Sequence, residues 1–413
     1  MRIWIDATDP RSLLPVFGMT LLERHLATIA SAGLGQAEVS IALPAESSRR
    51  PDLPPELMKR LNVRWLSEPG SLQERLGRAL QEMPGEPLLA LEADAIIDAR
   101  LLQYMAGQSG AMAACAGDGV VRTAILRLEG NLPLGEAVEG RLSRLADVCL
   151  TRKTLVPLPL ASVPSYIRKL RRDLPIYLFR VTDTASRDRA ERFLFWSNYK
   201  GSTDFFTKYV YPPLVWRMVR PLTRWRVHPN SVTAVSIVAT FLAVPFFAWE
   251  WWWTGFLLSY VMSVLDSVDG KVARLTFTSS QLGNVLDHGL DIVHPPLWYF
   301  GWAWGLSNGA TDSLVFQAAI WMLVVYTLDR IVAAAFKHRL GKSIHGYQPL
   351  DERMRTVISR RNINLPVFIL GWLLGFPVPT FLLIVLWQIV CFVFHVGRLV
   401  QFWSDRTVAE AAG

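Results

Sequence analysis

The stretch from Asp266 to Asp291, DSVDGKVARLTFTSSQLGNVLDHGLD, decides how the second half of this chain is interpreted. It places four carboxylates inside apolar sequence, with Asp266 and Asp269 three residues apart and Asp287 and Asp291 four residues apart. Charged side chains at membrane depth are costly and persist mainly where they bind ions or substrates. The stretch therefore predicts a functional site within a membrane domain. The alternative is a set of buried structural ion pairs.

Composition divides the chain into two parts. The 413 residues are 51% hydrophobic and include 16 Trp and 20 Phe, which is too apolar for an ordinary soluble protein. Residues 1–200 are mixed and charged, whereas residues 230–403 form a series of long apolar runs. The three cysteines have no paired or metal-ligand spacing, so we expect neither a disulfide framework nor a zinc site. The first residues lack the pattern of a secretory signal, which predicts that the first domain stays in the cytosol.

Six membrane spans are expected, at roughly 230–250, 252–275, 281–305, 314–337, 363–378 and 379–403. Lys and Arg are absent from 227–270, 275–329 and 362–397, so every basic residue falls on one side of such a layout. The positive-inside rule makes that side cytosolic. We therefore expect an integral plasma (inner) membrane protein whose two termini and four carboxylates lie on the cytosolic side.

Residues 199–228 are expected to lie at the membrane surface. TDFFTKYVYPPLVWRMVRPLTRWRVHPN alternates aromatic and aliphatic residues with five Lys or Arg, as an interfacial amphipathic helix does, and Pro212 and Pro213 are expected to break that helix. The alternative is a plain linker. The net charge of +8 fits a partner surface of anionic lipid, and nothing resembles a nucleic-acid-binding module.

The spacing of the four carboxylates predicts a metal site. Residues three or four apart share one face of a helix, so the two pairs can form a box of four carboxylates. Mg²⁺ takes carboxylate and phosphate oxygens, and two metals about 4 Å apart recur in phosphoryl displacement. We expect Mg²⁺ or Mn²⁺ as cofactor, with two ions in the site. Gly270 and Gly283 leave room for a ligand, and Arg274 supplies a positive charge.

The pattern D266-x2-D269-G270-x2-A273-R274-x8-G283-x3-D287-x3-D291 resembles the signature of the CDP-alcohol phosphotransferase family at all eight positions. HPNSVT at 228–233 is similar to the family's entry into its first helix, and the resemblance covers residues 200–403. It implies a six-helix membrane domain, here 229–405, and a homodimer. The implied reaction moves the phosphoalcohol of a CDP-alcohol to an acceptor hydroxyl and releases CMP.

The resemblance also implies roles for individual residues. The metal ligands would be Asp266, Asp269, Asp287 and Asp291, with Asp291 as the catalytic general base. The CDP-binding residues would be Asn230, Thr233, Asp266, Gly270, Ala273, Arg274, Gly283 and Asp287. For Asn230 and Thr233 the alternative is helix N-capping.

The segment 337–361 holds seven Lys or Arg against two acids, so it could bind an anionic acceptor or a lipid phosphate. The residues favoured for this role are Arg330, Arg353, Arg360 and Arg361; topology alone is the alternative explanation of the cluster. Asp329 and Arg330 could form a structural pair or part of an acceptor pocket. His288 and His294 are expected to pack or to join a polar network rather than to bind metal.

Residues 1–198 are expected to form a cytosolic α/β domain. IWIDA, EVSIALP, VRWLSE, PLLALEAD and TAILRLEG have the character of strands, and LLERHLATIASAG and SLQERLGRALQEM that of amphipathic helices, which predicts a mostly parallel sheet. The domain resembles nucleotidyltransferases, with Asp94 at their metal position, and its junction is similar to that of bifunctional inositol-phosphate cytidylyltransferase/phosphotransferase proteins. IDATDPRSLLP lacks the Gly-rich loop and Pro-Lys of those enzymes, so we expect it to be inactive, as a scaffold or nucleotide sensor.

Three classes of function are compatible with these features: a metal-dependent phosphotransferase of phospholipid biosynthesis, a transporter that uses intramembrane acids, and a membrane anchor for a cytosolic domain. The eight-position pattern favours the phosphotransferase, and no internal repeat points to a transporter. The favoured donor is a CDP-linked polar alcohol, inositol-like, with a lipid or inositol-phosphate acceptor. The alternative is CDP-diacylglycerol with a soluble polar acceptor such as inositol phosphate or glycerol phosphate.

Overall fold

The computed structural model describes residues 1–45, 50–130, 140–167, 170, 172–199 and 201–403. Within these ranges, the description excludes the side chains of Val120, Leu282, Asn284, Leu286, Asp287, His288, Leu290 and Asp291. The chain forms two compact units. Unit 1 comprises residues 1–168 and 173–198, and unit 2 comprises residues 169–172 and 199–413.

Unit 1 is built on a seven-stranded mixed sheet. Its strands, in spatial order, are β10 (Val156–Pro157), β8 (Met112–Ala116), β9 (Thr123–Leu128), β6 (Leu88–Glu92), β1 (Arg2–Asp6), β4 (Glu38–Ala42) and β5 (Asn62–Leu66). Strands β6, β1, β4 and β5 run parallel, whereas β9 is antiparallel to both of its neighbours. The five strands expected from the sequence are confirmed, and β8 and β10 were not expected.

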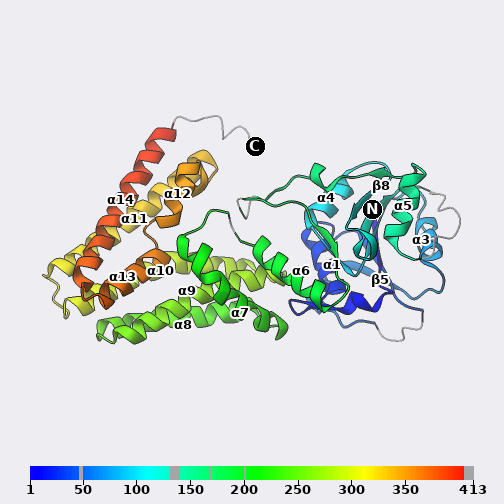
Figure 1. Ribbon diagram of the computed structural model, residues 1–413. Helices are drawn as coiled ribbons and strands as arrows, with labels where there is room; N and C mark the ends of the chain where they lie inside the picture. Colours follow the sequence, from blue (N-terminus) through cyan, green and yellow to red (C-terminus); the bar gives the residue numbers. More distant parts are fainter. Residues whose placement is uncertain (46–49, 131–139, 168–169, 171, 200, 404–413) are drawn as a thin grey trace. The chain divides into compact units, whose positions relative to one another are not determined.

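Helices cover both faces of this sheet, as Figure 1 shows. On one face, α1 (Leu21–Ser31) and α4 (Ala99–Gly107) pack on Ile3 and Ile5 of β1. On the other face, α3 (Leu72–Gln81) and α5 (Leu142–Thr151) pack on Trp4. Successive side chains of a strand point to opposite faces, so a parallel strand buried on both sides is apolar throughout. The expected α/β domain and both of its expected helices are confirmed.

Short elements complete unit 1. The strands are β2 (Pro15–Val16), β3 (Met19–Thr20), β7 (Ala95–Ile97), β11 (Tyr166–Ile167), β12 (Arg172–Asp173), of which Arg172 belongs to unit 2, and β13 (Leu178–Arg180). The helices are η1 (Pro10–Leu13), α2 (Pro55–Met58), η2 (Gly119–Val121), η3 (Leu160–Ser162) and α6 (Thr184–Ser197). Strand β13 pairs with β7, directly after Asp94, and thereby brings Arg180 to the carboxyl end of β6.

Unit 2 is helical. In chain order its elements are η4 (Phe206–Val210), α7 (Tyr211–Arg224), α8 (Pro229–Ala248), α9 (Trp252–Leu275), α10 (Gln281–Leu306), α11 (Leu314–Leu340), η5 (Ile344–Gly346), α12 (Pro349–Val357), α13 (Arg361–Leu373) and α14 (Pro377–Phe402). The expected break at Pro212 and Pro213 is wrong. A π-helical turn, η4, leads into α7. The two prolines lie in the first turn of α7, where the backbone N–H that proline lacks is not needed for a helical hydrogen bond.

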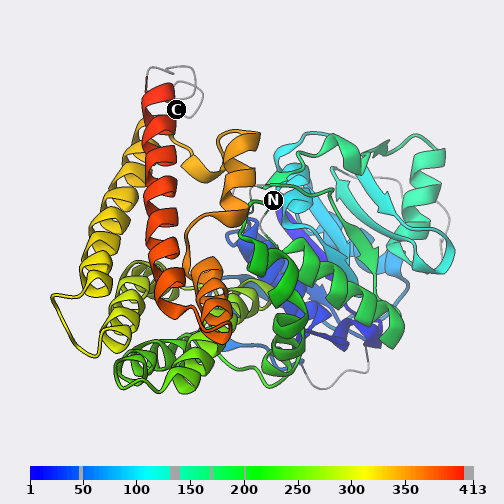
Figure 2. The ribbon, with the colours of Figure 1, turned by 60° about the vertical axis from the view of Figure 1, so that its left-hand side comes forward.

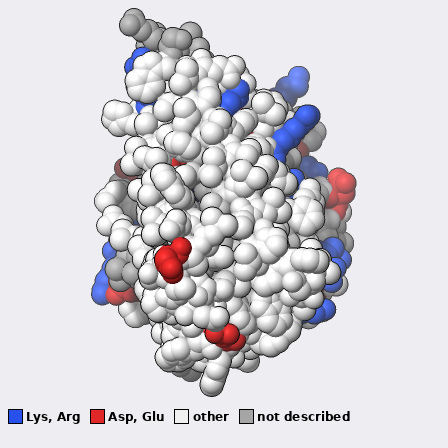
Figure 3. All heavy atoms as spheres, turned by 90° about the vertical axis from the view of Figure 1, so that its left-hand side faces the viewer, with Lys and Arg blue, Asp and Glu red and all other residues white. Residues whose placement is uncertain are grey.

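Three of the described helices, α8, α11 and α14, are long and apolar enough to cross a membrane. Helix α9 carries Asp266, Asp269, Lys271 and Arg274 near its end, and α13 is only 13 residues long. A turn at Gly375, with φ of 81°, separates α13 from α14. Helices α11 and α14 lie side by side in Figures 1 and 2. The face in Figure 3, on the side of these helices, carries few charged side chains.

An aromatic core joins α8, α9, α10 and α13. Trp302 and Phe368 stack with ring centroids 4.2 Å apart, and Phe247 and Phe256 pack beside them. Gly305 allows a close approach, since a Cβ there would lie 2.3 Å from the Phe247 carbonyl oxygen. This packing fixes the helices whose opposite ends carry the candidate site.

Candidate functional site

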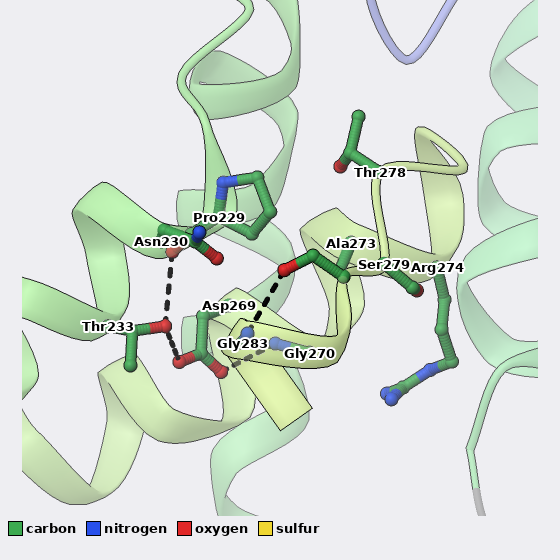
Figure 4. A pocket seen from close by; sticks show the side chains of 11 residues that line it. Pro229, Asn230, Thr233, Asp269, Gly270, Ala273, Arg274, Thr278, Ser279 and Gly283 are labelled. Carbon is green, nitrogen blue, oxygen red and sulfur yellow. Dashed lines mark hydrogen bonds between the residues drawn. The ribbon is translucent and has the colours of Figure 1, made fainter. Parts of the chain in front are cut away.

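A cavity opens where the beginning of α8, the end of α9 and the beginning of α10 meet (Figure 4). It is lined by Pro229, Asn230, Thr233, Asp269, Gly270, Ala273, Arg274, Thr278, Ser279, Ser280 and Gly283. Six of these eleven residues are among the eight that the resemblance assigns to CDP binding. The other two are Asp266, which lies outside the lining, and Asp287, whose side chain lies outside the described residues.

Local capping sets the ends of two of these helices. The His228 ring caps α8, because its Nδ1 accepts a hydrogen bond from the Asn230 backbone N–H at 3.2 Å. Neither Asn230 nor Thr233 is therefore the N-cap residue, which was the alternative explanation for both. Ser280 caps α10 and accepts from the Gly283 N–H at 3.0 Å. Capping of this kind satisfies backbone donors that a helix start leaves open.

Asp269 is the best-defined acid of the cavity. Its side chain is buried, its Oδ2 accepts from the Thr233 hydroxyl at 2.6 Å, and its Oδ1 accepts from the Gly270 N–H at 2.5 Å (Figure 4). A carboxylate oxygen has two lone pairs, so each oxygen keeps acceptor capacity beyond these bonds. Two neutral donors thus hold the carboxylate in one orientation, as a ligand to a hard cation requires.

Gly283 keeps the floor of the cavity open. A Cβ at this position would lie 3.0 Å from Asn230 Oδ1 and 3.1 Å from Ser280 Oγ. Both distances are tighter than ordinary contacts between carbon and oxygen. A side chain at 283 would therefore displace polar groups that line the cavity, which explains why the pattern has glycine there.

Asp266 lies against Arg361, with Oδ2 and Nη2 2.7 Å apart. Arg361 also reaches His294, whose Nε2 is 2.7 Å from Nη1, so His294 joins a polar network. Asp287 and Asp291 belong to α10, about one and two helical turns after Gly283, but their side chains lie outside the described residues, as does that of His288. Their role as ligands and base stays a prediction.

Asp266 and Asp269 suit a hard divalent cation, because such cations take carboxylate oxygens as ligands. The space beside them stays open because residue 283 is glycine and has no Cβ to fill it. Among the side chains that the structure describes, no three His, Cys, Asp or Glu are grouped so as to hold a metal ion. Two of the four expected ligands are not among those side chains.

The residues expected to bind an acceptor are dispersed. Arg330 lies over the Tyr326 ring, 4.8 Å from its centroid, Arg353 is exposed on α12, and Arg360 precedes α13. Asp329 binds His395 rather than Arg330, with Oδ1 and Nδ1 2.5 Å apart, and accepts from Gln388 at 3.4 Å. Burial, together with Arg355 and Arg360, holds the pKa of His345 well below its ordinary value.

Asp94 in unit 1 is bound by arginines. Its Oδ1 accepts from Arg141 at 2.5 Å and its Oδ2 from Arg180 at 2.7 Å, and the carboxylate is buried. Arg141 also pairs with Glu92 at 3.3 Å. Burial raises the pKa of Glu92, while Arg141 opposes the shift. Because two arginine cations neutralise this buried carboxylate, unlike the two neutral donors at Asp269, Asp94 does not fit a metal ligand in this arrangement.

Comparison with known proteins gives several matches. The model of the CDP-alcohol phosphatidyltransferase family matches residues 226–405. A CDP-alcohol phosphatidyltransferase class-I family protein of Schizosaccharomyces pombe is 29% identical over 115 residues, which cover 24% of this chain and 29% of the relative. Human ethanolaminephosphotransferase 1 is 33% identical over 107 residues, covering 22% of this chain and 26% of the relative. The chain thus spans under a third of the length of these two relatives.

A longer match covers the inner membrane protein YnjF of Escherichia coli, 31% identical over 172 residues, or 39% of this chain and 77% of the relative. Among solved structures, a protein assigned as a glucose-1-phosphate thymidylyltransferase from Bacillus anthracis is similar at a TM-score of 0.32 and 10% identity, over 46% of this chain and 94% of that chain. The apolar helices and the E. coli relative make this an integral membrane protein. With its family match over 226–405 and its coverage of that relative, the chain belongs to the CDP-alcohol phosphatidyltransferase family.

Proposed function

We propose that this protein transfers the phosphoalcohol of a CDP-alcohol to an acceptor hydroxyl and releases CMP. The observation that carries the proposal is the cavity between α8, α9 and α10, which gathers six expected CDP-binding residues from three helices. The first of these residues, Asn230, and the last, Gly283, are 53 positions apart in the sequence, so only the fold brings the set together. A site of this kind suits a nucleotide because it combines small residues, hydroxyls and an arginine.

In the proposed reaction, Arg274 balances phosphate charge, and Thr233 and the Gly270 N–H keep the Asp269 carboxylate oriented. Asp266, Asp269, Asp287 and Asp291 would hold Mg²⁺ or Mn²⁺, in a family that is generally metal-dependent. Such ions, when bound, stabilise charge on the transferring phosphate. Asp291 takes the proton of the acceptor hydroxyl as its oxygen attacks the β-phosphorus, and the bond from that phosphorus to the CMP oxygen breaks.

For the substrates, we favour a CDP-linked polar alcohol as donor and a lipid or an inositol phosphate as acceptor. The name of the human relative, an ethanolaminephosphotransferase, supports the transfer of a small polar alcohol. CDP-diacylglycerol with a soluble polar acceptor is the alternative donor class. The two classes differ in product, because only the first transfers a polar headgroup.

We also propose six membrane spans, formed by α8, α9, α10, α11, α13 and α14, within a membrane domain at 229–405. The three strongly apolar helices are α8, α11 and α14. We count α9, α10 and α13 as spans as well, because they share one aromatic core with α8. The site then lies on the cytosolic side of the inner membrane, where Arg224, Arg226, Lys271 and Arg274 gather. Residues 1–198 form an inactive cytosolic domain, 199–228 contact lipid, and the protein is a homodimer.

The test is CMP release by the purified full-length protein in lipid nanodiscs, with Mg²⁺ or Mn²⁺ and a panel of CDP-alcohols and acceptors. Wild-type protein is expected to release CMP with at least one donor. Asp291→Asn should abolish release, since an amide cannot accept the proton. Asp312→Asn is the matched control, because Asp312 is exposed in the loop before α11, beyond the end of α10 that is opposite to the cavity. Undiminished release by Asp291→Asn would overturn the assignment of the base.

A further inference from the structure

Arg361, the first residue of α13, is enclosed by groups from three helices. Its Nη2 donates to Asp266 of α9 at 2.7 Å, and its Nη1 contacts His294 of α10 at 2.7 Å. Its Nε donates to Asn362 Oδ1 at 3.1 Å, and Nη1 also lies 3.2 Å from the sulfur of Met262. Only 8% of the side chain is exposed. Each guanidinium nitrogen therefore has a partner within the protein.

The contact with His294 fixes the state of that ring. A guanidinium can only donate, so His294 Nε2 must accept, and the proton of the neutral ring is on Nδ1. His294 is 1% exposed and lies edge-on to Trp298, with ring centroids 5.3 Å apart. The ring cannot turn without losing both contacts. His294 thus acts as a fixed acceptor that holds one arm of the Arg361 fork while the other arm meets Asp266.

The other side of Arg361 is held through Asn362. The Asn362 amide donates to Asp204 Oδ2 at 3.3 Å and to Thr207 Oγ1 at 3.0 Å. Asp204 is buried and accepts from the Thr207 N–H and hydroxyl, both at 2.9 Å. The start of η4 is thereby tied to the start of α13. A planar group held at three corners can keep a carboxylate in place far better than a flexible cation can.

We propose that Arg361 is a positioning residue for Asp266, and so for the metal site, and is not a ligand of the acceptor phosphate. This inference rests on the proposed function, because it takes Asp266 to be a metal ligand. Arg361 holds Oδ2 of Asp266, which orients the carboxylate and balances one of the four acids of the site. Partners of metal-binding carboxylates are known to set the affinity of the site as well as its geometry.

The decisive substitution is Arg361→Lys, because it keeps the charge and removes the fork. A single ammonium cannot span both Asp266 and His294 in the same plane, so the carboxylate loses its fixed orientation. We expect the Kd for Mn²⁺ to rise about tenfold, the lower end of the effect reported for partners of this kind. Asn362→Ala, which removes the support of Nε, should raise the Kd in the same direction and by less. Arg339→Lys is the matched control, since Arg339 is exposed and contacts Trp403.

The measurement is Mn²⁺ binding by electron paramagnetic resonance of the free ion, with the full-length protein in nanodiscs and no CDP-alcohol present. The acceptor KM is measured in parallel. A double-mutant cycle adds specificity: in an Asp266→Asn background, Arg361→Lys should change the Mn²⁺ Kd no further, because the carboxylate that it positions is gone. A merely structural role of Arg361 would not produce that loss of effect.

Wild-type Mn²⁺ affinity in both Arg361→Lys and Asn362→Ala would overturn the proposal. A raised acceptor KM at unchanged Mn²⁺ affinity would also overturn the proposal, because it would indicate that Arg361 binds the acceptor. If Arg361→Lys fails to fold, Asn362→Ala decides by the same measurement. Wild-type protein that releases no CMP from any donor counts against the proposed function, whereas active wild type with unaffected variants overturns only the role of Arg361.

Discussion

Replacing Thr233 by valine tests whether the cavity between α8, α9 and α10 is a metal and nucleotide site. The Thr233 hydroxyl donates to Asp269 Oδ2 at 2.6 Å, and both side chains are buried. The valine keeps the branched shape and removes the donor. Hydrogen bonds to charged groups contribute about 1.5 to 3 kcal/mol, and about 1.4 kcal/mol corresponds to a factor of ten. We therefore expect the Mn²⁺ concentration for half-maximal CMP release to rise by about 10-fold to 100-fold.

Thr240→Val provides the matched control. Thr240 is buried on the same helix, and its hydroxyl donates to the Ser236 carbonyl at 2.8 Å, without contact to the cavity. The assay is a Mn²⁺ titration of CMP release for wild type and both variants, with thermal unfolding as a check of stability. Equal Mn²⁺ dependence in the two variants would refute the reasoning, because the bond to Asp269 would then have no bearing on the site.

Two further predictions concern unit 1, and both can be measured by hydrogen exchange of peptides from β1 and β6 in the full-length protein. Arg180→Met leaves the buried Asp94 with one fewer partner and should lower the free energy of unfolding by about 3 to 5 kcal/mol. Arg64→Met, at the exposed pair with Glu82, is the control and should cost at most about 1 kcal/mol. Equal protection from hydrogen exchange in the two variants would contradict this prediction. Burial lowers the pKa of His25 from 6.5 to about 4. As the pH falls, the unfolded chain therefore takes up a proton at His25 before the folded chain does. The free energy of unfolding should fall between pH 6.5 and pH 4, by about 1.4 kcal/mol per pH unit. His25→Gln should weaken that pH dependence, and an unchanged slope would show that other groups cause it.

Much of unit 2 could be predicted because its signals are local. Apolar runs and prolines predicted the positions of six helices to within about five residues, and the spacing of Asp269, Gly270, Ala273 and Arg274 placed them on one helix end; the six are α8, α9, α10, α11, α13 and α14, whereas α12 was not expected. The strands β1, β4, β5, β6 and β9 were likewise marked by short apolar runs. The error at Pro212 and Pro213 came from treating proline as a break, although the first turn of a helix accepts it.

Long-range polar pairs could not be predicted. Arg361 and Asp266 are 95 positions apart, His395 and Asp329 are 66 apart, and Arg398 and Asp351 are 47 apart. No periodicity connects such residues, and a basic segment read alone suggests an anion site. In the fold, Arg361 and Arg398 instead point inward and bind the acids Asp266 and Asp351. Arg361 was therefore assigned to an acceptor phosphate, whereas its observed partners are Asp266 and His294.

The most direct test of the central claim is to measure CMP and the second product together, by mass spectrometry, across a matrix of CDP-alcohols and acceptors with purified protein and Mg²⁺ or Mn²⁺. The account predicts equal amounts of CMP and of one phosphodiester product for at least one pair, and loss of both when a chelator removes the metal. The absence of CMP and phosphodiester from every pair, with folded protein and metal present, would contradict it.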